Sequence, residues 1–151
     1  MKKKTLKKIM FLAGLGILVS IYLLNLHYSS SESEICNINP VFSCTDVKNS
    51  SYSEAFGIPM AGYGLIGYLI IGVIVLFRYN KKKWLGNGKV KRLFTPQNLF
   101  YVSFLGLIIS LYLTYLEIFV INALCLFCLI SFGIIALITY YTYDNIKIRK
   151  K

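Results

Sequence analysis

Four cysteines, grouped in two pairs, are the residues of this chain that are best suited to chemistry. Cys125 and Cys128 form a Cys-x-x-Cys motif inside an apolar run, whereas Cys36 and Cys44 lie in a polar segment. Positions three apart on a helix share one face and lie close enough for a disulfide. Because the positive end of a helix dipole favours thiolate, a pair at a helix start is also reactive. The spacing therefore predicts a redox-active dithiol at Cys125 and Cys128.

The composition of the chain is that of an integral membrane protein. Of its 151 residues, 56% are hydrophobic, and the mean hydropathy of +0.62 is too high for an ordinary soluble domain of this size. The formal net charge of +11 does not indicate nucleic acid binding. The basic residues form short clusters beside long apolar runs, where membrane topology and contact with anionic lipid headgroups explain them.

Apolar runs predict one all-α domain, residues 1–151, built as a bundle of four transmembrane helices. The predicted spans are residues 9–26, 59–79, 99–120 and 124–143, with an outer loop at 27–58 and a cytoplasmic loop at 80–98. The first run exceeds the usual apolar part of a signal peptide, about 7–15 residues, and no clear cleavage site follows, so we expect it to remain as a helix. Ala13, Gly16 and Ser20 predict a close packing face on this helix.

The distribution of charge predicts the orientation of the chain. Of the 17 Lys and Arg residues, all but Lys48 lie before the first span, between the second and third, or after the fourth. By the positive-inside rule these three regions face the cytoplasm, and the chain is a multi-pass protein of the plasma membrane. The N- and C-termini are therefore predicted to be cytoplasmic. Both cysteine pairs then lie on the outer side.

Several residues near the cysteines carry further expectations. Asn122 is expected to cap the fourth helix, and a short helix is expected in the outer loop up to Phe56. Glu117 is the only acid within a predicted span. It either reaches water at the membrane interface or takes part in proton transfer. His27 is expected at the interface without a special role.

Inert structural bridges are one explanation of the cysteine pairs, since disulfides form and persist outside the cytoplasm. They fit poorly, because four helices in a bilayer need no staple and a Cys-x-x-Cys ring closes a very short loop. A zinc site with four cysteine ligands is disfavoured by the wide spacing of Cys36 and Cys44 and by an oxidising compartment, so no metal is predicted.

A disulfide relay is the explanation that remains. An outer pair can exchange with a soluble partner and pass its electrons to a membrane-held inner pair. The inner pair then needs a terminal acceptor that is soluble in lipid, which indicates a quinone.

These residues together resemble the vitamin K epoxide reductase family in its bacterial form. The resemblance is carried by the loop segment Cys36–Cys44, by Ser50, by the tetrapeptide Phe56-Gly57-Ile58-Pro59 and by the motif Cys125-Leu126-Phe127-Cys128. They occur in the order and spacing of the family, and the match covers nearly the whole chain. The resemblance implies a four-helix bundle around a quinone, with the outer loop acting as a cap.

Roles for single residues also follow from the resemblance. Cys36 is expected to exchange with the partner protein, and Cys44 is expected to attack Cys125. Cys128 is then the cysteine at the quinone. Ser50 corresponds to the loop hydroxyl of the family that lies near the site.

Two departures separate this chain from the vertebrate members of the family. Those enzymes carry a tyrosine four positions after the second helix cysteine, where this chain has Phe132. Their quinone-binding asparagine at the start of the second span has no counterpart here. These departures count against epoxide reduction, which would use such polar contacts. Phe56 and Phe132 are expected to contact the quinone together with Cys128.

The sequence therefore predicts a membrane thiol–disulfide oxidoreductase. It would take electrons from an extracytoplasmic thioredoxin-like dithiol protein and give them to menaquinone or ubiquinone, thereby making disulfides. We expect the donor to be a separate protein, because no thioredoxin-like domain is fused to either end. The alternatives are a quinone or vitamin K epoxide reductase, whose product is the hydroquinone, and a non-enzymatic membrane scaffold or transporter subunit with structural disulfides.

Overall fold

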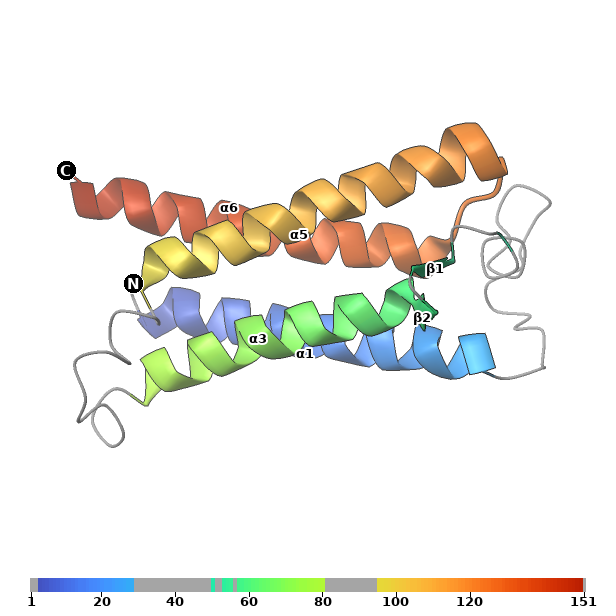
Figure 1. Ribbon diagram of the computed structural model, residues 1–151. Coiled ribbons are helices and arrows are strands. Elements are labelled where there is room, and N and C mark those ends of the chain that lie inside the picture. The colour runs from blue at the N-terminus through green and yellow to red at the C-terminus, as the bar shows by residue number, and fades with distance from the viewer. Residues whose placement is uncertain (1–2, 29–49, 51–52, 56, 81–94, 151) are drawn as a thin grey trace.

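The computed structural model describes residues 3–28, 50, 53–55, 57–80 and 95–150 (Figure 1). Its helices are α1 (Lys3–Tyr28), α3 (Met60–Tyr79), α5 (Pro96–Leu116) and α6 (Leu126–Lys150), and α5 continues directly into a π-helical segment, η1 (Glu117–Ile121). Within the described part of the chain, four helices are long and apolar enough to cross a membrane when α5 and η1 are taken together. The predicted all-α bundle of four transmembrane helices is thus confirmed.

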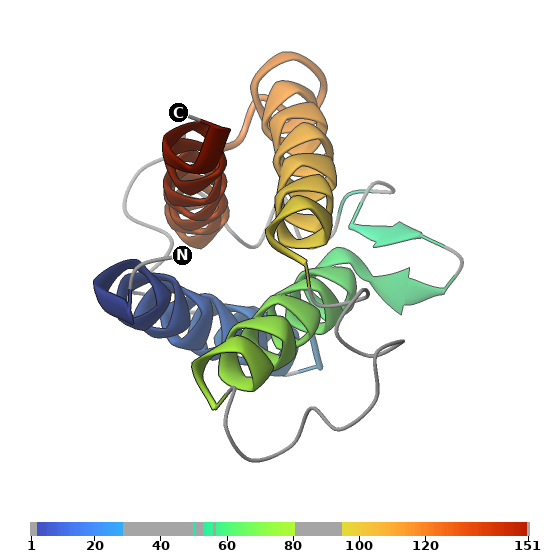
Figure 2. The same ribbon diagram turned by 90° about the vertical axis from the view of Figure 1, so that its left-hand side faces the viewer.

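The helices pack side by side along one common axis. α1 packs along α3, α5 packs along α6, and α1 also contacts α6. Seen from one end, the four helices stand at the corners of a four-sided bundle (Figure 2). Both termini lie at one end of this bundle, and the connection from α5 to α6 lies at the other end (Figure 1).

Large apolar side chains cover the outside of the bundle. Phe11 on α1 is 67% exposed and Phe119 on η1 is 66% exposed, and many leucines and isoleucines on all four helices are similarly accessible. A soluble monomer rarely exposes so much contiguous apolar surface. These side chains therefore face the lipid hydrocarbon, as the membrane assignment requires.

Small residues allow α1 and α3 to approach closely. Ala13, Gly16 and Ser20 are all buried on α1, which confirms the predicted packing face. A Cβ placed on Gly16 would lie 2.5 Å from the ring of Tyr68 on α3. The buried Tyr68 hydroxyl donates to the backbone oxygen of Ser131 on α6 at 2.9 Å. Because Gly16 has no side chain, the Tyr68 ring of α3 packs directly against α1 while its hydroxyl binds α6, so one residue connects three helices.

Gly16→Ala should destabilise the bundle, because its methyl group would overlap the Tyr68 ring, which is held in place by the hydrogen bond to α6. Overpacking of a filled core costs about 1–3 kcal/mol. Thermal unfolding of the protein in detergent micelles measures the loss. Gly14→Ala is the matched control on the same helix, since a Cβ there meets nothing within 4 Å. An equal fall of Tm in both variants would contradict the packing argument.

A short β-ladder precedes α3, where the sequence predicted a helix up to Phe56. β1 (Glu54–Ala55) pairs antiparallel with β2 (Ile58–Pro59), in the register Glu54 to Pro59 and Ala55 to Ile58. Gly57 has φ +76°, a left-handed conformation that glycine adopts at little cost, and it lets the chain reverse. The helix prediction is therefore wrong at Glu54 and Ala55. Phe56 and the earlier part of that predicted helix lie outside the described residues.

The start of α6 also differs from the sequence prediction. The sequence predicts a helix from Leu124 capped by Asn122, whereas α6 begins at Leu126. Asn122 instead has φ 55° and terminates η1, in a left-handed region that asparagine tolerates better than most residues. Cys125 consequently precedes α6, where the sequence placed it in the first turn.

α3 differs from its predicted span, 59–79, by one residue, but two other helices start several residues before their predicted spans. α1 starts at Lys3, before the predicted residue 9, and α5 starts at Pro96, before residue 99. Apolar runs mark the part of a helix that meets hydrocarbon, whereas backbone hydrogen bonds continue into the polar flanks. Pro96 suits the first turn of α5, because its missing N–H would have no partner there.

Candidate functional site

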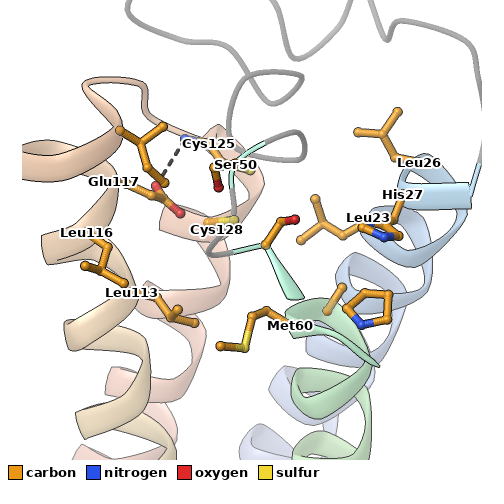
Figure 3. A pocket seen from close by; sticks show the side chains of 14 residues that line it. Leu23, Leu26, His27, Ser50, Met60, Leu113, Leu116, Glu117, Cys125 and Cys128 are labelled. Atoms are coloured by element: carbon orange, nitrogen blue, oxygen red, sulfur yellow. Dashed lines mark hydrogen bonds between the residues drawn. The ribbon is translucent and has the colours of Figure 1, made fainter. Parts of the chain in front are cut away.

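A pocket lies at the end of the bundle that carries the connection from α5 to α6 (Figure 3). Its described lining consists of Leu23, Leu26, His27, Ser50, Ser53, Pro59, Met60, Ala61, Leu113, Leu116, Glu117, Ile121, Cys125 and Cys128. Most of these side chains are apolar. The polar lining residues are the two cysteines, one histidine, one glutamate and two serines.

Cys125 occupies the N-cap position of α6. Its carbonyl oxygen accepts the backbone N–H of Leu129 at 3.1 Å, which is the first hydrogen bond of the helix. Its sulfur accepts the backbone N–H groups of Phe127 and Cys128. A sulfur atom in this capping position is stabilised as thiolate by the N–H groups and by the helix dipole. The reactivity expected of a helix start is therefore kept, although Cys125 lies one residue before the helix.

The two sulfur atoms differ in their surroundings. Cys125 is 2% exposed and packs against Leu23, Leu26 and Phe127. Cys128 lies in the first turn of α6, is only half-buried and faces the pocket (Figure 3). The side chain of Cys128 is hydrogen-bonded to that of Cys125. The pair is thus close enough to exchange thiol and disulfide forms, with Cys128 as the more accessible member from the pocket.

Glu117 is buried beside this pair, at 4% exposure. Its Oε2 accepts the backbone N–H of Cys125 at 3.1 Å, and its side chain is also hydrogen-bonded to the Cys128 thiol. Of the two expectations for this acid, contact with water at the interface is wrong. The sequence offered one signal for its position, because it is the only acid of a predicted span and lies shortly before the Cys-x-x-Cys motif.

Comparison with sequence models of known protein families identifies the family of the chain. A sequence model of the vitamin K epoxide reductase family matches residues 7–143, which include both cysteine pairs, Ser50 and Glu117. The chain belongs to the vitamin K epoxide reductase family. No curated protein matches it closely enough to be compared. Family membership makes the chain a membrane oxidoreductase of quinone-linked thiol–disulfide chemistry.

A quinone suits the pocket of this vitamin K epoxide reductase family member. Apolar side chains such as Leu26, Met60 and Leu113 form most of the described wall, as a planar, largely apolar ring requires. Cys125, Cys128 and Glu117 lie together at one side of the pocket, and His27 of α1 lies across from them (Figure 3). The residues present therefore fit the group that the family implies.

His27 is a pocket residue that sequence reasoning missed. It lies near the end of α1 and lines the pocket. Its Nε2 lies 2.9 Å from Oε1 of Glu54 on β1. This pair joins α1 to the β-ladder at the rim of the site. No local sequence signal indicates it, because the partners are 27 positions apart.

The other predicted site residues divide into two groups. Ser50 lines the pocket together with Cys128. Phe132 is half-buried on α6, one turn after Cys128, and does not belong to the described lining of this pocket. The remaining predicted site residues, Cys36, Cys44 and Phe56, lie outside the described residues.

Proposed function

We propose that the chain is a quinone-dependent thiol oxidase that reoxidises a thioredoxin-like protein. Electrons enter at Cys36 and Cys44 from an extracytoplasmic dithiol protein, pass to Cys125 and Cys128, and leave to a membrane quinone, menaquinone or ubiquinone. The donor protein thereby gains a disulfide. One observation supports this most directly: Cys125, Cys128 and Ser50 line the same apolar pocket.

The relay consists of two exchanges between the pairs. The Cys44 thiolate attacks Cys125 in the inner disulfide, and Cys128 leaves as a thiolate. Cys36 then attacks Cys44, which forms the outer disulfide and releases Cys125 as a thiolate at the N-cap of α6. The N–H groups that bind the Cys125 sulfur stabilise it as a leaving group. A bound quinone supplies the final oxidation, because it accepts two electrons and two protons.

The proposed orientation places the pocket outside the cell. α1 begins and α6 ends at the end of the bundle opposite the connection from α5 to α6 (Figure 1), and the pocket lies at the end that carries this connection. Lys3, Lys4, Lys7 and Lys8 lie in the first turns of α1, and Lys147 lies near the end of α6. By the positive-inside rule this basic end faces the cytoplasm. Both termini are then cytoplasmic, and the donor protein meets the opposite face.

Membrane vesicles of known orientation test this function and its sidedness together. Right-side-out and inside-out vesicles that contain the protein and menaquinone or ubiquinone receive a reduced thioredoxin-like protein, which cannot cross the membrane. We expect the donor to become oxidised and hydroquinone to form in right-side-out vesicles only. Chromatography of the extracted quinones and thiol alkylation of the donor measure the two products.

The controls separate the proposal from its alternatives. Vesicles without the protein give the background rate. Hydroquinone formation in inside-out vesicles only would reverse the orientation. No reaction in either preparation, with all cysteines stably bridged after alkylation, would support a scaffold. Consumption of added vitamin K epoxide would instead indicate the reductase, which the phenylalanine at position 132 disfavours.

A further inference from the structure

We propose that Glu117 is the base that accepts the proton of the Cys128 thiol when the inner cysteine pair is oxidised. This role rests on the proposed function and adds the proton acceptor to the thiol chemistry of the same site. It follows from the contacts of one buried carboxyl group, from the backbone that holds it and from the proton balance of the reaction.

The contacts place the Cys128 thiol between two acceptors. Its side chain is hydrogen-bonded to the carboxyl group of Glu117 and to the sulfur of Cys125. The Glu117 carboxyl is fixed by a second interaction, because its Oε2 accepts the backbone N–H of Cys125 at 3.1 Å. Figure 3 shows this carboxyl on the pocket wall beside the two cysteines. The thiol proton thus has a carboxylate within direct reach.

Backbone hydrogen bonds at Glu117 fix the place of its side chain beside the cysteines. Glu117 begins η1, and its carbonyl oxygen accepts the backbone N–H of Asn122 and that of Ala123 at 3.2 Å. A π-helical turn inside an α-helix often occurs at functional sites. Both the carbonyl and the carboxylate of one residue therefore organise the connection to α6.

The proton balance of the oxidation shows that the Cys128 thiol needs a base. Oxidation of the inner pair, present as one thiolate and one thiol, forms one S–S bond, passes two electrons to the quinone of the proposed function and releases one proton. Cys125 is favoured as thiolate by its capping position, so the proton that needs a base is that of Cys128. The S–H bond of Cys128 breaks, an O–H bond forms on Glu117, and the proton is held on the pocket wall. Neutralisation of a buried carboxylate is favourable, because burial penalises the charged form.

Few other titratable groups face Glu117. Cys125 and Cys128 face it from the start of α6. From α1, His27 lines the same pocket, and it is paired with Glu54 of β1 at 2.9 Å. The part of α3 in the described lining, Met60 and Ala61, has no ionisable side chain. Glu117 is therefore the one carboxyl group in the described lining.

Alkylation of Cys128 tests this role without any quinone. In a reduced Cys125→Ser background, the rate of alkylation of the Cys128 peptide is followed by mass spectrometry, with Glu117 intact or with Glu117→Gln. The amide keeps the volume and an oxygen acceptor for the backbone N–H of residue 125, but it cannot take a proton. With Glu117, we expect little change in rate between about pH 6 and pH 8, because the proton moves within the pair. With glutamine, the rate should rise about tenfold per pH unit.

The outcomes of the alkylation test are distinct. Asp144→Asn, on α6 far along the helix from the pocket, is the matched control and should reproduce the profile of the protein with Glu117. Parallel pH profiles for glutamate and glutamine at position 117 would overturn the proposal, since a purely structural role changes the rate at every pH by the same factor. A changed profile in the Asp144 variant as well would also overturn it.

Quinone reduction gives a second readout that separates the two proposals. In a single turnover at about pH 7, Glu117→Gln should slow quinone reduction by about 10²-fold, the lower range for loss of a general base, with recovery as the pH rises. A wild-type protein that reduces no quinone would overturn the proposed function, while the alkylation profile would still decide the role of Glu117. Unchanged reduction by the glutamine variant would overturn only that role.

Discussion

Replacement of Cys128 by alanine should abolish quinone reduction and leave a disulfide between Cys44 and Cys125 in the purified protein. In the proposed relay, the Cys125 thiolate can attack Cys44 of the outer disulfide and displace Cys36. Resolution toward the quinone then requires an attack on Cys125 from within the bundle. Cys128 is in place for this attack, because its side chain is hydrogen-bonded to that of Cys125. Without it, the mixed disulfide accumulates.

Peptide mapping under non-reducing conditions, after alkylation of the remaining thiols, identifies the bridge. Cys125→Ala is the matched variant, because it removes the neighbouring cysteine of the same motif. In this variant we expect Cys128 to stay unbridged to the loop and, with added quinone, to give a visible thiolate–quinone absorption. A bridge from Cys44 to Cys128 in the Cys125 variant, together with normal turnover, would reverse the assignment of the two roles.

The membrane helices and one packing face could be predicted because their signals are local. An apolar run of about 20 residues can satisfy its backbone in lipid only as a helix. The small residues Ala13, Gly16 and Ser20 recur at helical spacing, and the structure buries all three. The partner that fills the space at Gly16, the ring of Tyr68, could not be predicted, since no local pattern says which helix faces which.

The position of Cys125 could not be predicted from the Cys-x-x-Cys spacing alone. Helical periodicity does not distinguish an α-helical turn from a π-helical one, so η1 was not foreseen. Asn122 is equally suited to capping a helix and to ending one in a left-handed conformation. In the structure Asn122 ends η1 in the left-handed conformation, and the Glu117 carboxyl, instead of an asparagine cap, accepts the backbone N–H of Cys125. The same hydrogen bond holds the Glu117 carboxyl in the pocket, whereas the sequence had allowed for a position in water at the membrane interface.

Replacement of Cys36 and replacement of Cys44 should have different effects on turnover with a protein donor and with a small dithiol. In Cys36→Ala, oxidation of the thioredoxin-like donor should fall to the level of vesicles without the protein, because the cysteine proposed to form the first mixed disulfide with the donor is missing. A small dithiol can enter the pocket and attack the inner disulfide at the half-buried Cys128 or at Cys125. Part of the quinone reduction with this donor should therefore remain.

In Cys44→Ala, Cys36 is still able to exchange with the donor protein, but nothing passes the electrons inward. With a donor variant that keeps one active-site cysteine and is supplied as a mixed disulfide with a small thiol, the Cys36 thiolate displaces the small thiol. We expect a stable bridge between Cys36 and this donor, visible as a band of higher mass on a non-reducing gel and absent from the Cys36 variant. Hydroquinone formation with the protein donor should be at background in both variants. Equal loss with the protein and the small dithiol in Cys36→Ala would contradict a separate docking cysteine. It would indicate instead that the outer pair is needed for every route of electrons to the pocket at Cys128.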